Sequence, residues 1–346
     1  MWPFKQKETR SAYTLPELEA LLGTANSRSG VAVDSSTAQA LTAVFSAVSF
    51  ISKGVAGYPL SASTNALDDV LNQSPDGVMT AYHWRSAVMQ NLLLTGNAYS
   101  RLRWKRTGQL DKVEFLHSSR VSTVIEPPHK LKGYLVDGKP VGRSNMLHFK
   151  INAYDGLVGK SPIGVCRESV GLGLAQQNQA ADQVKNGLRP NGIIEFPAAL
   201  GATAGQKFRE SLSKRTSGDT LILEGGGSWK SIALSNVDAE FLESRRFSVD
   251  EVARMFNLDK IWLQNSQHGA RYDELGASQK SLLTNTLQPY MIELESELSL
   301  KLGQPIAFNL SEIQRLDVKT RYEAYKAAID AQILSPEEVR QREGFK

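Results

Sequence analysis

The nearest approach to a catalytic motif in this chain is a glycine-rich segment around residue 160. Residues 154–162 read Tyr-Asp-Gly-Leu-Val-Gly-Lys-Ser-Pro, and Gly159-Lys160-Ser161 matches the end of a phosphate-binding loop, Gly-x-x-x-x-Gly-Lys-Ser/Thr. In such a loop, backbone N–H groups and a helix N-terminus surround the phosphates of a nucleotide. Tyr154 occupies the place of the first glycine, so the loop is incomplete.

Pro162 favours a structural interpretation of the same segment. Proline fits the first turn of a helix, where its missing N–H is not needed, and the preceding Ser161 is a good N-cap. Two enzymatic alternatives are disfavoured by their incomplete motifs. They are a P-loop-like nucleotide hydrolase that would use Lys160 with Glu224, and a serine hydrolase, for which the Gly-x-Ser-x-Gly turn is missing.

The composition points away from metal and redox chemistry. Cys166 is the single cysteine, and the five histidines show neither Cys-x-x-Cys nor His-Glu-x-x-His spacing. We expect no catalytic residue, no cofactor and no metal, and folding in a reducing cytoplasm. The N-terminus lacks the apolar core of a signal peptide, and no run approaches the roughly 20 apolar residues of a membrane span, so no membrane partner is expected.

The charge balance limits the classes of nucleic-acid-binding protein. Forty Lys and Arg residues against 36 Asp and Glu residues leave a net charge of +4 on 346 residues. So small a net charge excludes a basic nucleic-acid-binding tail. A generic DNA-binding module is disfavoured because the composition is near neutral and no recognition motif is present. Any DNA binding must come from local charge or from repetition of the chain in an oligomer.

Periodic patterns predict the elements that would position these residues. Apolar residues at helical spacing predict a helix from Ala38 with a stripe formed by Leu41, Val44, Val48, Ile51 and Val55. A second helix is predicted from Thr80, ending near Gly96, with its own stripe of Trp84, Val88 and Leu92. From Asn97 the period changes to two, and residues 134–148 read as a hairpin that turns at Asp137-Gly138.

The second half of the chain is mainly helical. One helix is predicted over 162–187. Its glycines and alanines favour close packing against a neighbouring helix, and the alternative is a floppy or broken helix. Another is predicted over 237–257. The insert between them should hold a strand at 193–196, a short helix capped by Thr203, and a hairpin of 220–223 with 229–234.

The C-terminal third contains an irregular segment and three further helices. Residues 258–271 are too polar and irregular for either periodicity, and a loop of this length is usually functional or disordered. A long helix follows over 283–302, with a kink at Pro289 and a stop at Gly303. A helix over 322–329 precedes another that a Ser335–Glu338 capping box should open.

These elements, in this order, resemble the portal proteins of tailed bacteriophages, of the type common in long-tailed phages. The likeness covers nearly the whole chain, from about Gly30 to Gly344. Its specificity lies in an ordered set of stretches, which are residues 42–48, 96–99, 156–162, 186–192 and 251–258.

The resemblance implies an α+β portal fold and assigns a place in it to each part of the chain. The implied parts are an N-terminal arm (1–37), an α+β wing (38–160), a stem helix (161–190), a small α/β clip (191–235), a second stem helix (236–258), a tunnel loop (259–274), a long kinked wing helix (275–310) and a short helical crown (311–346). Because this crown is short, any role that depends on a large internal collar is in doubt.

The resemblance also implies a function and partners. It implies a structural ring of about twelve subunits at one capsid vertex, through which double-stranded DNA passes without sequence preference during packaging and ejection. The implied partners are other copies of the chain, the large terminase, the major capsid or scaffolding protein and a head–tail adaptor. The expected location is the virion, after assembly in the host cytoplasm.

Three groups of residues are the candidate sites. Lys260, His268 and Arg271 in the tunnel loop are expected to touch the DNA backbone, unless the loop is merely solvated. Arg245, Arg246 and Arg254 are expected either to face the channel or, as we favour, to pair with Glu168 and Asp182 of a neighbouring stem, because arginine binds carboxylates bidentately. Trp229 and Lys230 could dock partners at the clip, although Trp229 could equally fill the hairpin core.

Overall fold

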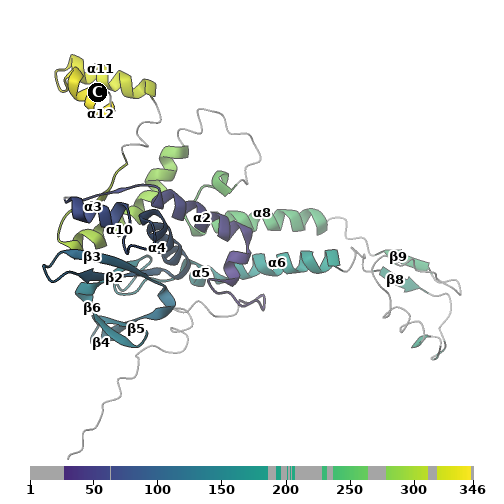
Figure 1. The fold of residues 1–346 in the computed structure, drawn as a ribbon. Coiled ribbons are helices and arrows are strands. Elements are labelled where there is room, and N and C mark those ends of the chain that lie inside the picture. Colours follow the sequence, from purple (N-terminus) through teal and green to yellow (C-terminus); the bar gives the residue numbers. More distant parts are fainter. Residues whose placement is uncertain are drawn as a thin grey trace, which may run out of the picture. The chain divides into compact units, whose positions relative to one another are not determined.

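The computed structural model divides into two compact units, each made of separate stretches of chain (Figure 1). It describes residues 27–62, 64–185, 192–195, 201, 203, 205–206, 228–231, 237–263, 278–310 and 318–343. Unit 1 comprises Met1–Phe50, Gln90–Asn97 and Lys150–Thr286, and unit 2 comprises Ile51–Met89, Ala98–Phe149 and Leu287–Lys346. The predicted wing, residues 38–160, thus contributes to both units, and the domain boundaries stay predictions.

Two helices contain the apolar stripes that the sequence predicted. They are α2 (Thr42–Ala56) and α4 (Ala81–Thr95), and a third helix that the sequence did not predict, α3 (Asn65–Asn72), lies between them in the chain. The predicted stripe residues of α2 from Val44 to Val55 are buried, as are those of α4, which confirms both patterns. The first helix begins later than expected from Ala38, because η1 (Thr37–Ala40) is a short 3-10 turn and Leu41 is extended.

Gly96 ends α4 in the left-handed conformation, with φ of 77°, as the sequence predicted. A side chain here would also collide with the chain, since a Cβ atom would lie 2.4 Å from the carbonyl of Lys160. Both requirements select glycine at this position.

Two three-stranded antiparallel sheets follow α4, with strand orders β3-β2-β7 and β4-β5-β6. Asp137 and Gly138 both have positive φ and form the tight turn between β5 and β6, as predicted. The predicted hairpin does not extend to His148, because residues 146–150 leave the second sheet and join the edge of β2. The strands are β2 (Asn97–Trp104), β3 (Leu110–Leu116), β4 (Val121–Glu126), β5 (Lys130–Val136), β6 (Lys139–Gly142) and β7 (Met146–Lys150), with short 3-10 turns η2 (Ser118–Arg120) and η3 (Arg143–Asn145).

An aromatic cluster fills the space between the two sheets. The imidazole of His148 stacks on Tyr99 with ring centroids 4.5 Å apart, and the Tyr134 hydroxyl lies 3.3 Å from His148 Nδ1. Burial raises the pKa values of Tyr99 and Tyr134 well above the ordinary tyrosine range. Both phenols therefore stay neutral within the core of unit 2.

A buried arginine in unit 2 satisfies the ends of two helices. Arg85 is 5% exposed, and its Nε and one terminal nitrogen donate to the carbonyls of Ala56 and Leu71, at 3.0 and 2.9 Å. These carbonyls lie in the last turns of α2 and α3, where helices lack internal donors and attract cations. Burial lowers the Arg85 pKa, but an arginine keeps its charge at neutral pH.

The last residues of the predicted N-terminal arm (1–37) are packed against the rest of unit 1. Ser27 and Val33 are buried, and the Arg28 N–H donates to Glu168 Oε2 at 2.9 Å. Gly171 allows this contact, since a Cβ there would lie 2.2 Å from Ser27 Oγ. Close packing and a hydrogen bond thus hold this segment against helix α6 (Arg167–Lys185).

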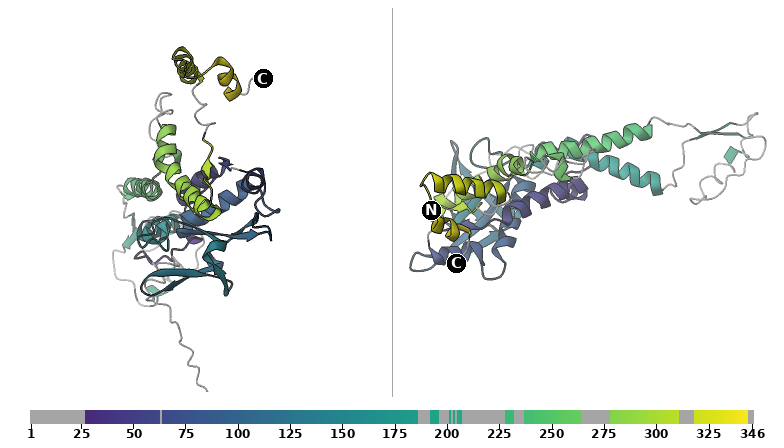
Figure 2. Two further views of the ribbon diagram at one scale, coloured as in Figure 1. Left: turned by 90° about the vertical axis from the view of Figure 1, so that its left-hand side faces the viewer. Right: turned by 90° about the horizontal axis from the view of Figure 1, so that it is seen from above.

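The helix predicted over 162–187 is in fact two helices. They are α5 (Pro162–Val165) and α6 (Arg167–Lys185), separated at Cys166, which leaves the helical region with ψ of 24°. The helix predicted over 237–257 is confirmed as α8 (Val237–Met255). Figures 1 and 2 show α6 and α8 side by side and antiparallel.

The insert between these helices contains an antiparallel strand pair. Strand β8 (Gly192–Glu195) confirms the strand predicted near 193, and it pairs with β9 (Ser228–Ser231). The sequence had paired residues 229–234 with 220–223 instead. Residues 220–223, like most of the helix predicted from Thr203, lie outside the described residues.

The kink predicted at Pro289 appears as a change of helix type. A π-helical turn, η5 (Leu282–Leu287), precedes α10 (Gln288–Leu302), and Pro289 lies in the first turn of α10. Proline cannot donate to the carbonyl four residues earlier, which disturbs the ladder at this point. Gly303 stops α10 with φ of 71°, as predicted.

The prediction of an irregular loop over 258–271 is wrong at its start. Residues Lys260–Leu263 form a 3-10 turn, η4, and its Trp262 stacks on Phe50 with ring centroids 5.4 Å apart.

The last helix of the chain begins as predicted. Ser335 opens it through a reciprocal capping box with Glu338. The other elements are β1 (Leu60–Ser61), which pairs with β10 (Ala307–Phe308), and the helices α11 (Val318–Asp330) and α12 (Pro336–Glu343).

Candidate functional site

The glycine-rich segment is built around a reciprocal pair of hydrogen bonds. Asn97 Nδ2 donates to the Gly159 carbonyl and the Gly159 N–H donates to Asn97 Oδ1, both at 2.8 Å. Gly159 is required here because a Cβ atom would lie 2.0 Å from the Gly96 carbonyl oxygen. The bend that resembled a nucleotide loop is therefore tightly packed against the end of α4.

The other amides of this segment are also occupied. The N–H groups of Leu157 and Val158 donate to Asp155 Oδ1 at 2.8 and 3.0 Å, and the Lys160 N–H donates to the Ile151 carbonyl at 3.0 Å. A phosphate-binding loop needs such amides free to face the ligand. The structure thus gives the nucleotide alternative no phosphate cradle at residues 157–160.

The side chains of Lys160 and Ser161 have structural partners. Ser161 Oγ accepts from the Gly164 N–H at 3.1 Å, as expected of an N-cap, and donates to the Leu94 carbonyl at 2.7 Å. Lys160 Nζ lies over the Tyr154 ring, 5.0 Å from its centroid. Glu224, the proposed partner of Lys160, lies outside the described residues.

The antiparallel helices α6 and α8 form the best-defined candidate surface. A Cβ atom at Gly173 would lie 2.5 Å from Ser248 Oγ, so the small residue lets α8 come close. Gln176 Nε2 donates to Ser244 Oγ, and Ser169 Oγ donates to Glu251 Oε2 at 3.4 Å. The small residues of α6 thus permit close packing, as the sequence suggested, with a helix of the same chain.

Arg254 is engaged within its own helix. Its guanidinium pairs with Glu251 one turn earlier and lies over the Phe247 ring, 5.6 Å from the centroid. Glu168, one of the carboxylates expected to bind these arginines, accepts from the Arg28 amide and lies 3.8 Å from Arg167. Both residues therefore have intrachain partners that the sequence did not suggest.

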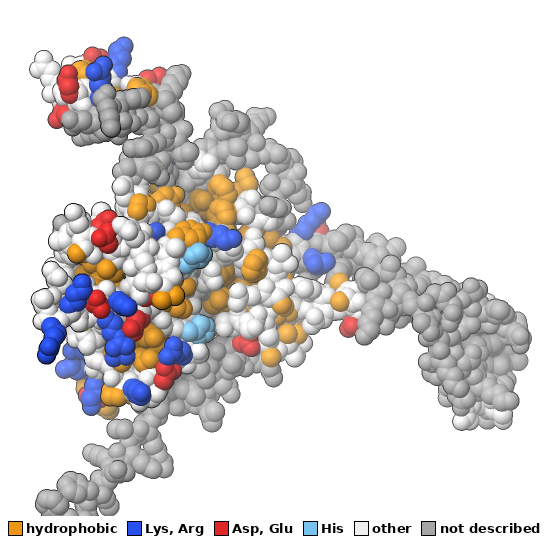
Figure 3. All heavy atoms as spheres, in the orientation of Figure 1, with side chains coloured by type: hydrophobic (Ala, Val, Ile, Leu, Met, Phe, Trp, Pro, Cys, Tyr) orange, Lys and Arg blue, Asp and Glu red, His pale blue; other side chains and the backbone are white. Residues whose placement is uncertain are grey.

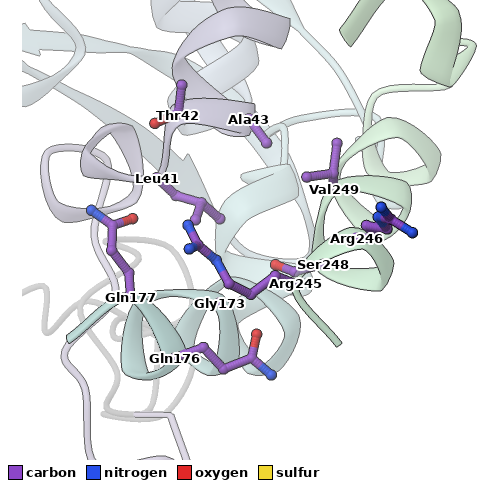
Figure 4. Close-up of a pocket in the computed structure, with 10 residues that line it drawn as sticks. All are labelled: Leu41, Thr42, Ala43, Gly173, Gln176, Gln177, Arg245, Arg246, Ser248 and Val249. Atoms are coloured by element: carbon purple, nitrogen blue, oxygen red, sulfur yellow. The ribbon is translucent and has the colours of Figure 1, made fainter. Parts of the chain in front are cut away.

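Arg245 and Arg246 lie at a hollow of about 290 Å³ between α6, α8 and the start of α2 (Figure 4). The Arg245 side chain extends toward Leu41 across this hollow, whereas Arg246 points away from it. Both arginines are exposed, and neither forms an ion pair with any residue that the structure describes. Asp182 on α6 is likewise exposed and has no ion pair among those residues.

Lys260 lies beside a second hollow, of about 470 Å³, which the end of α8 and the π-helical turn surround. Asn257 joins these two elements. Its Nδ2 donates to the Asn285 carbonyl at 2.7 Å, and its own carbonyl accepts from Thr286 Oγ1 at 2.6 Å. His268 and Arg271, the other tunnel-loop candidates, lie outside the described residues.

Trp229 and Lys230 lie within strand β9 rather than at a turn. Trp229 is opposite Ile194 and Lys230 is opposite Ile193 in the register with β8. The glycine run at 225–227, at which the hairpin tip was predicted, lies outside the described residues. The proposed clip contacts stay predictions.

Three further observations concern a metal site, a reactive thiol and a membrane-spanning helix. The described parts of the chain contain no group of His, Cys, Asp and Glu residues that could hold a metal ion. Burial and the nearby Glu251 raise the Cys166 pKa, which disfavours a reactive thiolate. Within the described helices, none has both the length and the apolar character needed to cross a membrane.

Sequence reasoning missed the residues that hold this region together. Asn97 and Gly159 both lie in stretches that carried the family resemblance, yet their pairing across 62 positions has no local signature. Asn257 could have been suspected from Pro289, because a proline leaves a carbonyl in need of another donor. Arg85 had no such signal, since nothing local distinguishes a buried arginine from an exposed one.

Comparison with known proteins identifies relatives across most of the chain. A family described as phage portal protein matches residues 42–344. The "Probable portal protein" of Streptomyces phage phiC31 is 28% identical over 351 residues, covering 91% of this chain and 77% of that protein. The "Portal protein" of Enterobacteria phage HK97 is 28% identical over 244 residues, covering 68% of this chain and 57% of its own length.

Solved structures show the same fold. A chain from the neck of a native gene transfer agent particle, computed with C12 symmetry, has a TM-score of 0.63 and 23% identity, covering 88% of this chain and 90% of its own. An HK97-family phage portal protein from Corynebacterium diphtheriae has a TM-score of 0.61 and 18% identity, covering 81% and 96%. These likenesses confirm the expected α+β portal fold.

Proposed function

The chain belongs to the phage portal protein family, and on that premise we propose that its copies assemble into a closed ring at one capsid vertex. The ring is a structural channel through which double-stranded DNA is packaged and later ejected. The observation that carries this proposal is the family match over residues 42–344. Arg245 and Arg246 support it, since both are exposed and form no ion pair with a described residue, which leaves them available to a neighbouring copy.

Ring formation needs a head-to-tail interface whose rotation closes. We assign Arg245 and Arg246 to that interface, with Asp182 of the adjacent copy as the partner carboxylate. All three are exposed and lack ion pairs in the described structure, and arginine forms bidentate hydrogen bonds with carboxylates. Arg254 takes a smaller part, because Glu251 of the same helix already neutralises it.

The tunnel loop supplies the DNA contacts in this proposal. Lys260, His268 and Arg271 would touch phosphates, with no readout of base sequence. Phosphate contacts exchange readily and carry no sequence information, which suits DNA that must slide. Lys260 supports the assignment because it lies at the start of the loop, beside an open hollow.

The remaining partners follow from the family. We propose that Trp229 and Lys230 help to dock the large terminase during packaging and a head–tail adaptor afterwards. Other surfaces of the ring would contact the major capsid or scaffolding protein. The ring would assemble in the host cytoplasm and stay in the virion.

No chemistry by this chain is part of the proposal. The amides of residues 157–160 are hydrogen-bonded within the protein, and Ser161 caps a helix, so the segment offers neither a phosphate cradle nor an activated hydroxyl. The energy for packaging would come from the ATPase activity of a separate motor.

The mass of the purified native protein tests this function. Light scattering should report an oligomer of about a dozen copies, and negative-stain images should show rings with an open centre. A protein that stayed monomeric even with capsid and scaffolding proteins, or that hydrolysed ATP alone, would contradict the proposal.

A further inference from the structure

Positive charge is concentrated in one part of the chain. Residues 98–149, which form most of β2 to β7, contain ten Lys or Arg and four Asp or Glu, a net charge of +6. The rest of the chain has 30 basic and 32 acidic residues, a net charge of −2. The near-neutral total therefore conceals one basic region, all of it within unit 2.

The acidic residues of this region are already neutralised within it. Each carboxylate forms an ion pair with a base of the same region, and the four pairs are Arg103–Glu114, Lys105–Asp111, Arg120–Asp137 and Lys132–Glu126. The excess charge consequently belongs to the other six bases.

These six bases form what we call the basic strand surface. None of them forms an ion pair with a residue in the described ranges, and all but Arg101 are exposed. Figure 3 shows Lys and Arg side chains gathered over strands β2 to β6. The six are Arg101, Arg106, Lys112, Lys130, Lys139 and Arg143.

We propose that the basic strand surface binds the phosphates of double-stranded DNA, as a second DNA contact separate from the tunnel loop. The bases come from two sheets and their turns, so the charge is spread rather than convergent. Neither of the hollows described above includes a residue from 98–149. An extended array of cations fits an extended polyanion better than one small ligand.

The lack of apolar anchors favours DNA over an acidic protein. Protein interfaces depend on a few large apolar or aromatic residues, whereas DNA interfaces are more polar and more positive. Among the exposed large hydrophobic residues of the described chain, only Trp104 belongs to 98–149. A single aromatic is also too few for a base-stacking platform, so duplex phosphate contacts are favoured over single strands.

DNA binding by the full-length protein tests the proposal. The ligand is a 30-base-pair duplex, about three helical turns long, and fluorescence anisotropy measures the affinity across a range of salt concentrations. The test variant replaces Arg106, Lys112, Lys130 and Lys139 with Gln. We expect at least a tenfold weaker affinity for DNA. We also expect a shallower plot of log K against log salt, by as much as about 0.9 for each phosphate that the variant no longer neutralises.

A control variant removes the same charge elsewhere, with Lys53, Lys280, Lys326 and Arg340 replaced by Gln, and all four are exposed. The control should bind DNA like the unmodified protein. Both variants should keep the native oligomeric mass, which separates this proposal from the proposed ring and channel. Equal weakening in both variants, unchanged binding in the test variant, or tighter binding of polyglutamate than of duplex DNA to this surface would overturn it.

Discussion

Asn97 and Gly159, 62 residues apart, are joined by two hydrogen bonds of 2.8 Å between the Asn97 amide and the Gly159 backbone. The pair fixes the bend that leads into α5 and α6 against the end of α4. It also occupies the Gly159 amide, which in a phosphate-binding loop would face a phosphate but here donates to Asn97 Oδ1.

Gly159→Ala should therefore destabilise the protein strongly. The added Cβ would lie 2.0 Å from the Gly96 carbonyl oxygen and 2.7 Å from that of Ile151, and backbone cannot move aside easily. We expect a loss of at least about 3 kcal/mol in the free energy of unfolding, measured by urea denaturation. Gly142→Ala is the matched control, because a Cβ there has open space. Equal losses in the two variants would contradict the packing argument.

Asn257 should compensate for Pro289. The Asn285 carbonyl lies four residues before the proline, which has no N–H to donate, and it accepts from Asn257 Nδ2 instead. Asn257→Gly retains the positive φ of 51° without strain and removes only the side chain. We expect a cost of about 1–2 kcal/mol in unfolding free energy.

A double-mutant cycle isolates this compensation. Pro289→Ala restores an N–H that can reach the Asn285 carbonyl, so Asn257→Gly should cost less in the Pro289→Ala background than alone. A coupling of at least about 0.5 kcal/mol is expected for residues that share one acceptor. Additive effects of the two substitutions would show that Asn257 does not replace the missing donor.

Arg85 should be essential for stability although it belongs to none of the proposed binding surfaces. Arg85→Met keeps much of the buried volume but leaves the Ala56 and Leu71 carbonyls without these donors. We expect a loss of about 2–4 kcal/mol in unfolding free energy from two buried carbonyls without a charged donor. Arg101→Met, at a partly exposed arginine, should change it by less than about 0.5 kcal/mol. A mild Arg85→Met phenotype would mean that water or another donor replaces the guanidinium.

The buried tyrosines predict a loss of stability in alkali. Burial raises the pKa of Tyr290 to about 12 and those of Tyr99 and Tyr134 further. The folded state therefore binds protons that the unfolded state releases above about pH 10. Below about pH 10, these groups should not affect the free energy of unfolding. This free energy should fall as the pH rises from the ordinary tyrosine pKa of the unfolded state to the raised pKa values of the folded state.

Absorbance at 295 nm measures this effect, because it reports tyrosinate directly. The two buried phenols, Tyr99 and Tyr134, should ionise only together with the loss of near-ultraviolet circular dichroism. Tyr99→Phe with Tyr134→Phe should reduce the dependence of stability on alkaline pH. Reversible ionisation of all ten tyrosines in the folded state would refute the assigned burial.

The proposed ring interface predicts a charge-reversal pattern. Arg246→Glu should prevent ring formation, since it places a carboxylate opposite Asp182 of the next copy, and Asp182→Arg in the same chain should restore rings. Arg254→Gln should leave ring assembly intact, because its partner Glu251 lies in its own helix. Native mass measurement distinguishes these outcomes, and rings formed by Arg246→Glu alone would remove the arginine from the interface.

Local patterns in the sequence determined the individual elements. The buried stripes of α2 and α4, the left-handed stop at Gly96, the Asp137-Gly138 turn and the Ser335 capping box each depend on residues within a few positions of one another. Period, capping and turn chemistry act over such distances, so they can be read without a fold. The ordered set of these elements also determined the family.

Tertiary structure alone decided which distant residues meet. Three contacts join segments whose local sequences do not predict a partner. They are the pairing of Asn97 with Gly159, the addition of β7 to β2, and the hydrogen bonds from Arg85 to the ends of two helices. The same holds for the basic strand surface. The sequence gives a net charge of +4, but only the folded structure decides which basic side chains form ion pairs with carboxylates and which do not. Long-range contacts depend on the packing of the whole chain, because each buried donor must find whichever acceptor the fold brings near.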